Sequence, residues 1–187
     1  MNDEPRRVLI LQGHPDARSP HFEHALADAY AHGAQHAGHL LRKVDVAALD
    51  FPLLHSKREW DEQPLPPDLA SAQEAIGWAT HIVVFFPLWL GGMPALLKGF
   101  FEQVARPGSA ISEMRAGALP RKLLTGRSAR IVVTMGMPAL IYRWFFRAHS
   151  LESLERNILK FCGIGPIREM LIGNVEDAAE REKGLAG

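Results

Sequence analysis

Cysteine is nearly absent from this chain, which contains a single one, Cys162, among 187 residues. One cysteine cannot form a disulfide bond within the chain, and it cannot supply an all-cysteine metal site. A disulfide framework is therefore excluded, and we expect the protein to reside in a reducing compartment, the cytoplasm.

Long apolar runs and an excess of charge of one sign are missing as well. The longest uncharged run, residues 82–97, is shorter than the roughly 18–20 apolar residues of a membrane span and is interrupted by proline and glycine. The apolar residues 8–11 are too few for the core of a signal peptide. Because 21 lysine and arginine residues balance 21 acidic ones, we expect no nucleic-acid partner and no membrane-spanning segment.

Two nucleotide-binding motifs are also lacking. The chain has no Gly-x-Gly-x-x-Gly after its first apolar run and no Gly-x-x-x-x-Gly-Lys-Ser/Thr, so neither a dinucleotide-binding Rossmann site nor a P-loop is supported. His32, His36 and His39 have nearly helical spacing, but no nearby carboxylate completes a metal site. We interpret them as a solvated helix face and expect no metal.

The residues that are present alternate between two kinds of segment. Short apolar runs, typical of buried strands, lie at 8–11, 40–46, 81–87, 130–134 and 166–172. Helical spacing of apolar residues lies at 20–38, 69–79, 94–104 and 151–162. This alternation predicts one α/β domain over residues 1–187, a parallel sheet covered by helices on both faces. We expect a long connection at residues 50–68, and frayed ends at residues 1–6 and 176–187.

Ligands of an open parallel sheet bind beyond the carboxyl ends of its strands, which makes three segments candidates. Residues 13–22 lead into a helix N-terminus that favours a phosphate, unless Ser19 merely caps that helix. Residues 87–94 offer an aromatic plane beside two glycines, which suits a flat ring, unless they only form the turn into the helix at Pro94. In residues 134–149, Tyr142 and His149 are seven apart and share a face if that stretch is helical.

The same segments resemble the flavodoxin-like NAD(P)H:quinone oxidoreductases of the DT-diaphorase type. The resemblance rests on His14-Pro15 with Ser19, on the block Phe86-Pro87-Leu88-Trp89 followed by Gly92-Met93-Pro94-Ala95-Leu96-Leu97-Lys98-Gly99, and on Thr134 with Gly136. It covers residues 8–172 and implies a doubly wound five-stranded sheet in the order 2-1-3-4-5, with non-covalently bound FAD or FMN. It also implies a homodimer with its active sites at the subunit interface.

The resemblance assigns residues to parts of the flavin. His14, Ser19, His21 and Phe22 would hold the phosphate end; Pro87, Leu88, Trp89, Leu90 and Gly91 would line the ring; Thr134 and Gly136 would flank its other edge. The chain departs from the family pattern in two places. Thr134-Met135-Gly136-Met137 replaces the Thr-Thr-Gly-Gly of many relatives, and the family histidine aligns with Ala148, one residue before His149.

The implied reaction is two-electron reduction of a quinone-like acceptor by NAD(P)H, with ping-pong kinetics. Reduced flavin carries negative charge along one ring edge, which a phenol or imidazole stabilises, and we assign Tyr142 and His149 to this catalytic role. Two other functions fit the same fold. One is a flavodoxin-like electron carrier; the other is a cytosolic regulatory subunit of a potassium-efflux system.

Overall fold

A computed structural model, which describes residues 4–113, 117 and 119–186, contains one five-stranded parallel sheet in the order β2-β1-β3-β4-β5. The strands are β1 (Arg7–Gln12), β2 (Leu40–Asp45), β3 (His81–Pro87), β4 (Ser128–Thr134) and β5 (Ile167–Ile172). The predicted flavodoxin-like fold and strand order are confirmed. Residues 1–3 and 187, which belong to the predicted frayed ends, lie outside the described range.

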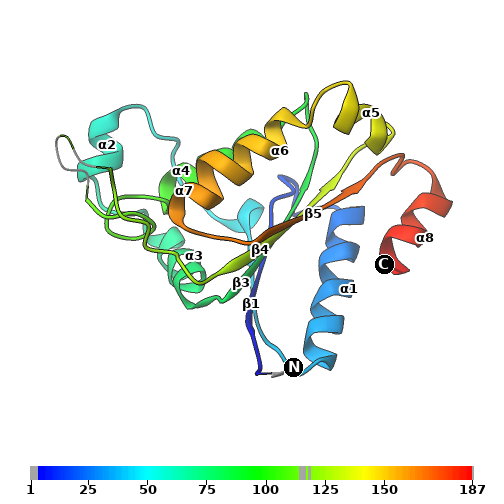
Figure 1. Ribbon diagram of the computed structural model, residues 1–187, viewed down its shortest axis with the longest axis horizontal. Helices are drawn as coiled ribbons and strands as arrows, with labels where there is room; N and C mark the ends of the chain where they lie inside the picture. Colours follow the sequence, from blue (N-terminus) through cyan, green and yellow to red (C-terminus); the bar gives the residue numbers. More distant parts are fainter. Residues whose placement is uncertain (1–3, 114–116, 118, 187) are drawn as a thin grey trace.

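Helical segments pack on both faces of the sheet. Figure 1 shows α1 and α8 on one face, with α3, α4, α6 and α7 on the other. The helices are α1 (Phe22–His36), α2 (Lys57–Glu62), α3 (Pro67–Trp78), α4 (Ala95–Val104), α5 (Ala139–Trp144), α6 (His149–Ser153), α7 (Lys160–Cys162) and α8 (Ala178–Ala186). A short 3-10 turn, η1 (Val46–Ala48), follows β2, and a π-helical segment, η2 (Leu154–Leu159), joins α6 to α7.

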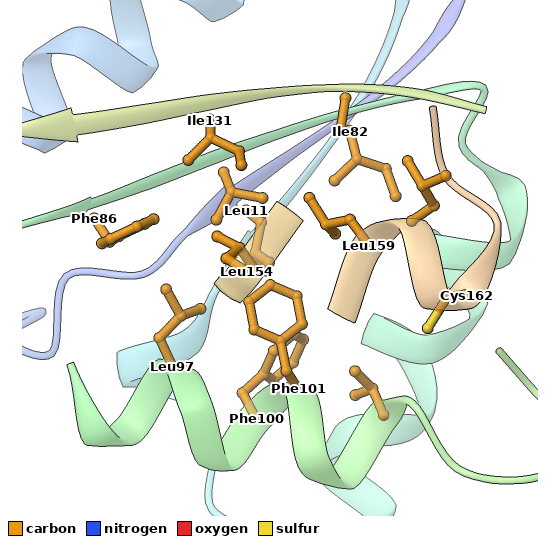
Figure 2. Packing of buried hydrophobic residues seen from close by; sticks show 14 of the residues in the cluster. Leu11, Ile82, Phe86, Leu97, Phe100, Phe101, Ile131, Leu154, Leu159 and Cys162 are labelled. Atoms are coloured by element: carbon orange, nitrogen blue, oxygen red, sulfur yellow. The ribbon is translucent and has the colours of Figure 1, made fainter. Parts of the chain in front are cut away.

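The larger core lies between the sheet and α3, α4 and η2. Alternate residues of the central strands, such as Leu11, Ile82 and Ile131, point toward this layer and are almost fully buried. Figure 2 shows them packed against Phe100 and Leu154. Because β1, β3 and β4 are covered on both faces, their sequences are nearly uninterrupted apolar runs, and that is why they were recognisable from sequence.

The smaller core lies beneath α1. Val8, Ile10, Val83, Phe85 and Val132 face this helix and are at most 2% exposed. No helix in the described residues combines the length and the apolar character needed to cross a membrane.

Three local features differ from the sequence-based expectation. Helix α1 begins at Phe22, with His21 as N-cap, two residues after the predicted start beyond Ser19. The segment 50–68 contains helix α2, whose Ser56 hydroxyl accepts a hydrogen bond from the Glu59 amide at 3.2 Å. Residues 178–186, expected to fray, form α8, which lies against α1.

Candidate functional site

The carboxyl ends of β1, β3 and β4 bring the three candidate segments together. The amide of Gly13, after β1, donates to the carbonyl of Phe85 in β3 at 2.7 Å. The amide of Leu88, after β3, donates to the carbonyl of Thr134 at the end of β4, at 2.8 Å. We call the region formed by residues 13–24, 87–93 and 134–138 the carboxyl-end site.

Gly13 allows the first of these loops to sit close to β3. A Cβ atom on Gly13 would lie 2.7 Å from Leu97 Cδ2 and 2.9 Å from the carbonyl oxygen of Phe85. Separations this short do not occur for real Cβ atoms, so glycine is needed here for the close approach of the backbone. The sequence therefore places the first loop directly over the end of β3.

A cluster of imidazoles fills the first loop. The His14 ring is 5% exposed and stacks on the His21 ring, with centroids 3.7 Å apart. The Asp16 amide donates to Nδ1 of His14 at 3.1 Å, and Nε2 of His21 donates to the Asp16 carboxylate at 3.0 Å. The His24 ring lies 5.6 Å from each of the other two imidazoles.

The protonation of this cluster follows from its surroundings. Burial lowers the pKa of His14, and the adjacent His21 lowers it further, against the opposing effect of Glu23. Nδ1 of His14 lies 3.1 Å from the Asp16 amide and 3.3 Å from the Asp16 carbonyl oxygen, so the loop backbone engages it in either tautomer, and Nε2 has no partner among the described residues. The hydrogen bond from His21 holds the pKa of the Asp16 carboxyl well below its usual range. Nε2 of His14 is thus free to meet a ligand inside the site.

Residues 89–92 form a tight two-residue hairpin. Trp89 and Gly92 exchange two backbone hydrogen bonds of 2.9 Å, and the two residues between them have positive φ, 48° at Leu90 and 79° at Gly91. Glycine adopts this conformation readily, whereas leucine does so at a cost, and such strain is typical of functional sites. The Leu90 side chain is fully exposed.

This hairpin offers both an aromatic surface and open backbone. The Trp89 side chain is 52% exposed, and its ring meets the His14 ring edge-on with centroids 6.0 Å apart. The amides of Trp89 and Gly92 are used within the hairpin, while those of Leu90 and Gly91 have no acceptor among the described residues. A Cβ atom on Gly91 would meet no heavy atom within 4 Å. The space beside these two amides is therefore open to a ligand.

The end of β4 is tied to α1 by an interaction that the sequence did not reveal. The Thr134 hydroxyl donates to the carboxylate of Glu23, in the first turn of α1, and both residues are almost completely buried. Beyond Thr134, Gly136 is exposed and lies next to Glu176, whose Oε1 would be 3.6 Å from a Cβ atom at Gly136. Thr134 is therefore joined to the first turn of α1, and its hydroxyl is already engaged.

Tyr142 and His149 do not share one helix. Helix α5 ends at Trp144, and Arg147 and Ala148 have positive φ before α6 begins at His149. The Tyr142 side chain is 1% exposed in the larger core, where its hydroxyl lies near the backbone of Leu151 without a hydrogen bond of regular geometry to any described residue. Burial raises its pKa. His149, in contrast, is exposed.

The structure thus assembles most of the predicted site residues and separates a few. The first loop, the hairpin and Thr134 lie together, whereas Phe22 packs toward α8, where a Cβ atom at Gly184 would be 3.0 Å from its ring. Ser19 is exposed at the loop surface. Pro87 is buried at the end of β3.

Residues missed from the sequence include Asp16, Glu23 and Ser150. The Ser150 hydroxyl lies 3.5 Å from the Cβ position of Gly92, so α6 begins beside the hairpin. For Glu23 a signal existed, because acidic residues are favoured in the first turn of a helix. Among the residues described, no group of three or more histidine, cysteine or acidic side chains is arranged to hold a metal ion.

Comparisons with known proteins agree with this architecture. A protein family described as having the flavodoxin-like fold matches residues 6–187. The chain is 24% identical over 195 residues to NAD(P)H dehydrogenase [quinone] 1 of Rattus norvegicus, covering 91% of this chain and 69% of that protein. It is 28% identical over 189 residues to the FMN-dependent NADH:quinone oxidoreductase of Nitratidesulfovibrio vulgaris, covering 88% of this chain and 85% of that protein.

A solved structure is similar over nearly the whole length. The NAD(P)H:quinone oxidoreductase from Methanothermobacter marburgensis superposes with a TM-score of 0.82 at 26% sequence identity, covering 98% of this chain and 95% of that one. The likeness therefore extends over nearly the whole chain.

Proposed function

The chain belongs to the flavodoxin-like fold family, and on that premise we propose that it is a flavin-dependent NAD(P)H oxidoreductase that reduces quinones or related electrophilic acceptors. The names of its relatives support this activity. The observation that carries the proposal is the strained hairpin at Leu90 and Gly91, which exposes two free amides beside an aromatic side chain.

The hairpin fits the ring of a flavin. A planar heteroaromatic ring needs an apolar surface, and it needs hydrogen-bond donors at its polar edge. Trp89 supplies aromatic surface, and the amides of Leu90 and Gly91 supply donors in a place where no side chain blocks the approach. We propose that these two amides orient the ring. Of residues 87–91, which were all predicted to line the ring, Leu90 and Gly91 would then be the ones that donate hydrogen bonds to it.

The first loop fits the phosphate end of the same cofactor. The amides of Phe22 and Glu23 at the start of α1 have no carbonyl within their helix to bond, and the helix dipole favours an anion there. We propose that His14 adds a donor through Nε2, in the tautomer whose Nδ1 accepts from the Asp16 amide. The Glu23 carboxylate would repel a phosphate, but it accepts the Thr134 hydroxyl and so is held toward β4. FAD and FMN both carry a phosphate that these donors could bind.

A flavin bound here supplies the capacity to accept a hydride from NAD(P)H and to deliver an electron pair to a second substrate. The residues of this chain bind and orient it. We propose that His149 stabilises negative charge at one ring edge, since it is exposed at the start of the helix whose next residue, Ser150, approaches Gly92.

Tyr142 is assigned to the same edge on the strength of its unpartnered buried hydroxyl. A buried hydroxyl without a partner is costly, and a bound ligand or a small shift of α5 would satisfy it. The carbonyl of Tyr142 accepts from the amide of Ala148 at 3.1 Å, so this residue also positions the turn that leads to His149.

We further propose that the protein is a cytoplasmic homodimer. Large apolar side chains are exposed around α5, with Leu140 at 70%, Trp144 at 77% and Phe145 at 79%. An exposed apolar patch of this kind marks an interaction surface, and α5 directly follows the β4 loop of the carboxyl-end site. A second copy covering α5 would therefore enclose the carboxyl-end site, where the acceptor would bind.

Steady-state kinetics test the proposed activity. Initial rates measured against NADH at several concentrations of a soluble quinone should give parallel double-reciprocal lines, since the product NAD+ leaves before the quinone binds. Intersecting lines would contradict this order of events. An electron carrier would show no sustained NAD(P)H oxidation by the isolated protein, and a purely regulatory subunit would show none without its partner.

A further inference from the structure

A large groove lies at the end of the sheet opposite the carboxyl-end site. Its volume is about 1020 Å³, and it is open to solvent between α1 and the amino-terminal parts of β4 and β5. Apolar side chains from four strands line the inner wall: Val8, Phe85 and Val132 are at most 2% exposed at this wall, whereas Met170 is partly exposed. Nothing in the proposed oxidoreductase activity uses this groove.

The groove lies beside α8, in the layer that α1 and α8 form on this face of the sheet. Gly184 and Leu185, near the last described residue of α8, line the groove. Figure 1 shows α8 lying along part of α1.

The wall formed by α1 is suited to close packing of another helix. Ala29, Gly33 and Ala37 are spaced four residues apart, are exposed, and line the groove. Residues without large side chains on one helix face let a second helix approach to the short end of the usual 8–10 Å interaxial distance. A small soluble anion would make no use of this stripe or of the apolar inner wall.

The rim of the groove is strongly basic. It includes Arg6, Arg127, Arg130 and Arg168, whereas Glu4 is the only acidic residue that lines it. In the described residues, Arg6, Arg130 and Arg168 form no ion pair. The Arg127 guanidinium is different, because it donates to the backbone carbonyls of residues 77 and 125.

The interior of the rim holds a half-buried polar network. His81 lies 2.8 Å from the Ser128 hydroxyl and 3.3 Å from the Tyr30 hydroxyl, and the Arg130 guanidinium lies over the Tyr30 ring, 5.7 Å from its centroid. Burial and then the nearby charges of Arg6, Arg130 and Arg168 lower the pKa of His81 to about 4. The groove therefore has a positive potential although the whole chain carries no net charge.

We propose that this arginine groove docks an amphipathic helix of a partner protein, with the apolar face of that helix against the small residues of α1 and Met170, and its acidic side chains on Arg6, Arg130 and Arg168. Helix-in-groove recognition of this kind combines apolar burial with charge complementarity at the rim. The proposal does not depend on the oxidoreductase activity.

A designed peptide pair tests the proposal with the full chain. The probe is a fluorescein-labelled helical 14-residue peptide of alanine, leucine and glutamate with its leucines on one face, and its control replaces every glutamate with lysine. Fluorescence anisotropy at low ionic strength should detect the acidic peptide and not the basic one. Binding should weaken as salt is added, because the rim charges are exposed.

Charge reversal of the rim identifies the site. The double variant Arg130→Glu/Arg168→Glu should weaken binding of the acidic peptide at least tenfold and should gain binding of the basic one. A matched variant, Arg58→Glu/Arg156→Glu, changes two exposed arginines outside the groove and should leave both affinities unchanged. Circular dichroism melting of both variants checks that each is folded.

Three results would overturn the proposal. The first is absence of binding by the acidic peptide, or equal binding by both peptides. The second is tight binding of inorganic tripolyphosphate, lost in Arg130→Glu/Arg168→Glu, with no peptide binding, which would make the groove a small-anion site. The third is sedimentation showing that the wild-type chain self-associates through this face and that the double variant does not.

Discussion

Replacing Gly91 with leucine is expected to empty the proposed flavin site while the protein stays folded. The Cβ atom would meet no protein atom within 4 Å, so the apo protein has room for the new side chain. Its stability cost comes from φ of +79°, and a left-handed non-glycine residue costs about 1–2 kcal/mol. For a chain of this size, that corresponds to a decrease of roughly 2–8 °C in Tm.

The flavin affinity should fall much further, because the leucine occupies the space beside the two free amides. We expect at least about a 100-fold weaker Kd, or roughly 2.7 kcal/mol. Gly108→Leu is the matched control, since Gly108 has φ of +88°, is exposed, and also has no atom within 4 Å of its Cβ position. Flavin fluorescence titration and thermal melting of both variants compare the two sites.

Equal flavin affinity in Gly91→Leu and Gly108→Leu would refute the assignment of the hairpin to the ring. A lower Tm in both variants with flavin loss in Gly91→Leu alone is the expected pattern. Unfolding of Gly91→Leu but not of Gly108→Leu would mean that the hairpin stabilises the fold instead of binding the ring.

Three further predictions concern other parts of the chain. His149→Ala and Tyr142→Phe should each lower kcat about 10-fold or more while flavin content stays near that of the wild type, and unchanged kcat would contradict their roles. Gly13→Ala should lower the free energy of unfolding by about 1–3 kcal/mol in urea titrations, because the Cβ atom collides with Leu97 and the β3 backbone. His81 should make stability fall as the pH drops from about 6.5 to about 4, because the unfolded chain takes up a proton that the folded one does not. The loss is about 1–3 kcal/mol, and His81→Gln should reduce it.

Controls separate these effects from general destabilisation. His36→Gln, on an exposed position of α1, should leave the pH dependence of urea unfolding as it is in the wild type. A pH dependence that is the same in His81→Gln as in the wild type would mean that another group causes it. For Gly13, an unchanged free energy of unfolding would show that Leu97 can move aside without cost.

Most of the sheet could be predicted from sequence because its central strands are buried on both faces. The run at 81–87 coincides with β3, and those at 8–11 and 130–134 lie within β1 and β4. Helix α2 was missed because the prolines of residues 50–68 indicated a connection, although Ser56 and Glu59 have the spacing of a capping box.

The site was less predictable, because its geometry depends on residues that are distant in sequence. Arg147 and Ala148 have positive φ although neither is glycine. Their sequence therefore does not indicate this conformation, and the break between Tyr142 and His149 could not be predicted. The pairing of Thr134 with Glu23 joins residues 111 positions apart. The block at 86–94 was recognisable because it is continuous in sequence, running from the end of β3 through the hairpin at 89–92 to the start of α4.

The most direct test of the proposed function is the absorbance of the purified protein, followed by mass identification of any flavin it releases. We expect a yellow protein with bands near those of oxidised flavin, close to one FAD or FMN per chain, and bleaching of the bands when NADH or NADPH is added. A colourless protein that binds neither FAD nor FMN in titrations would contradict the account.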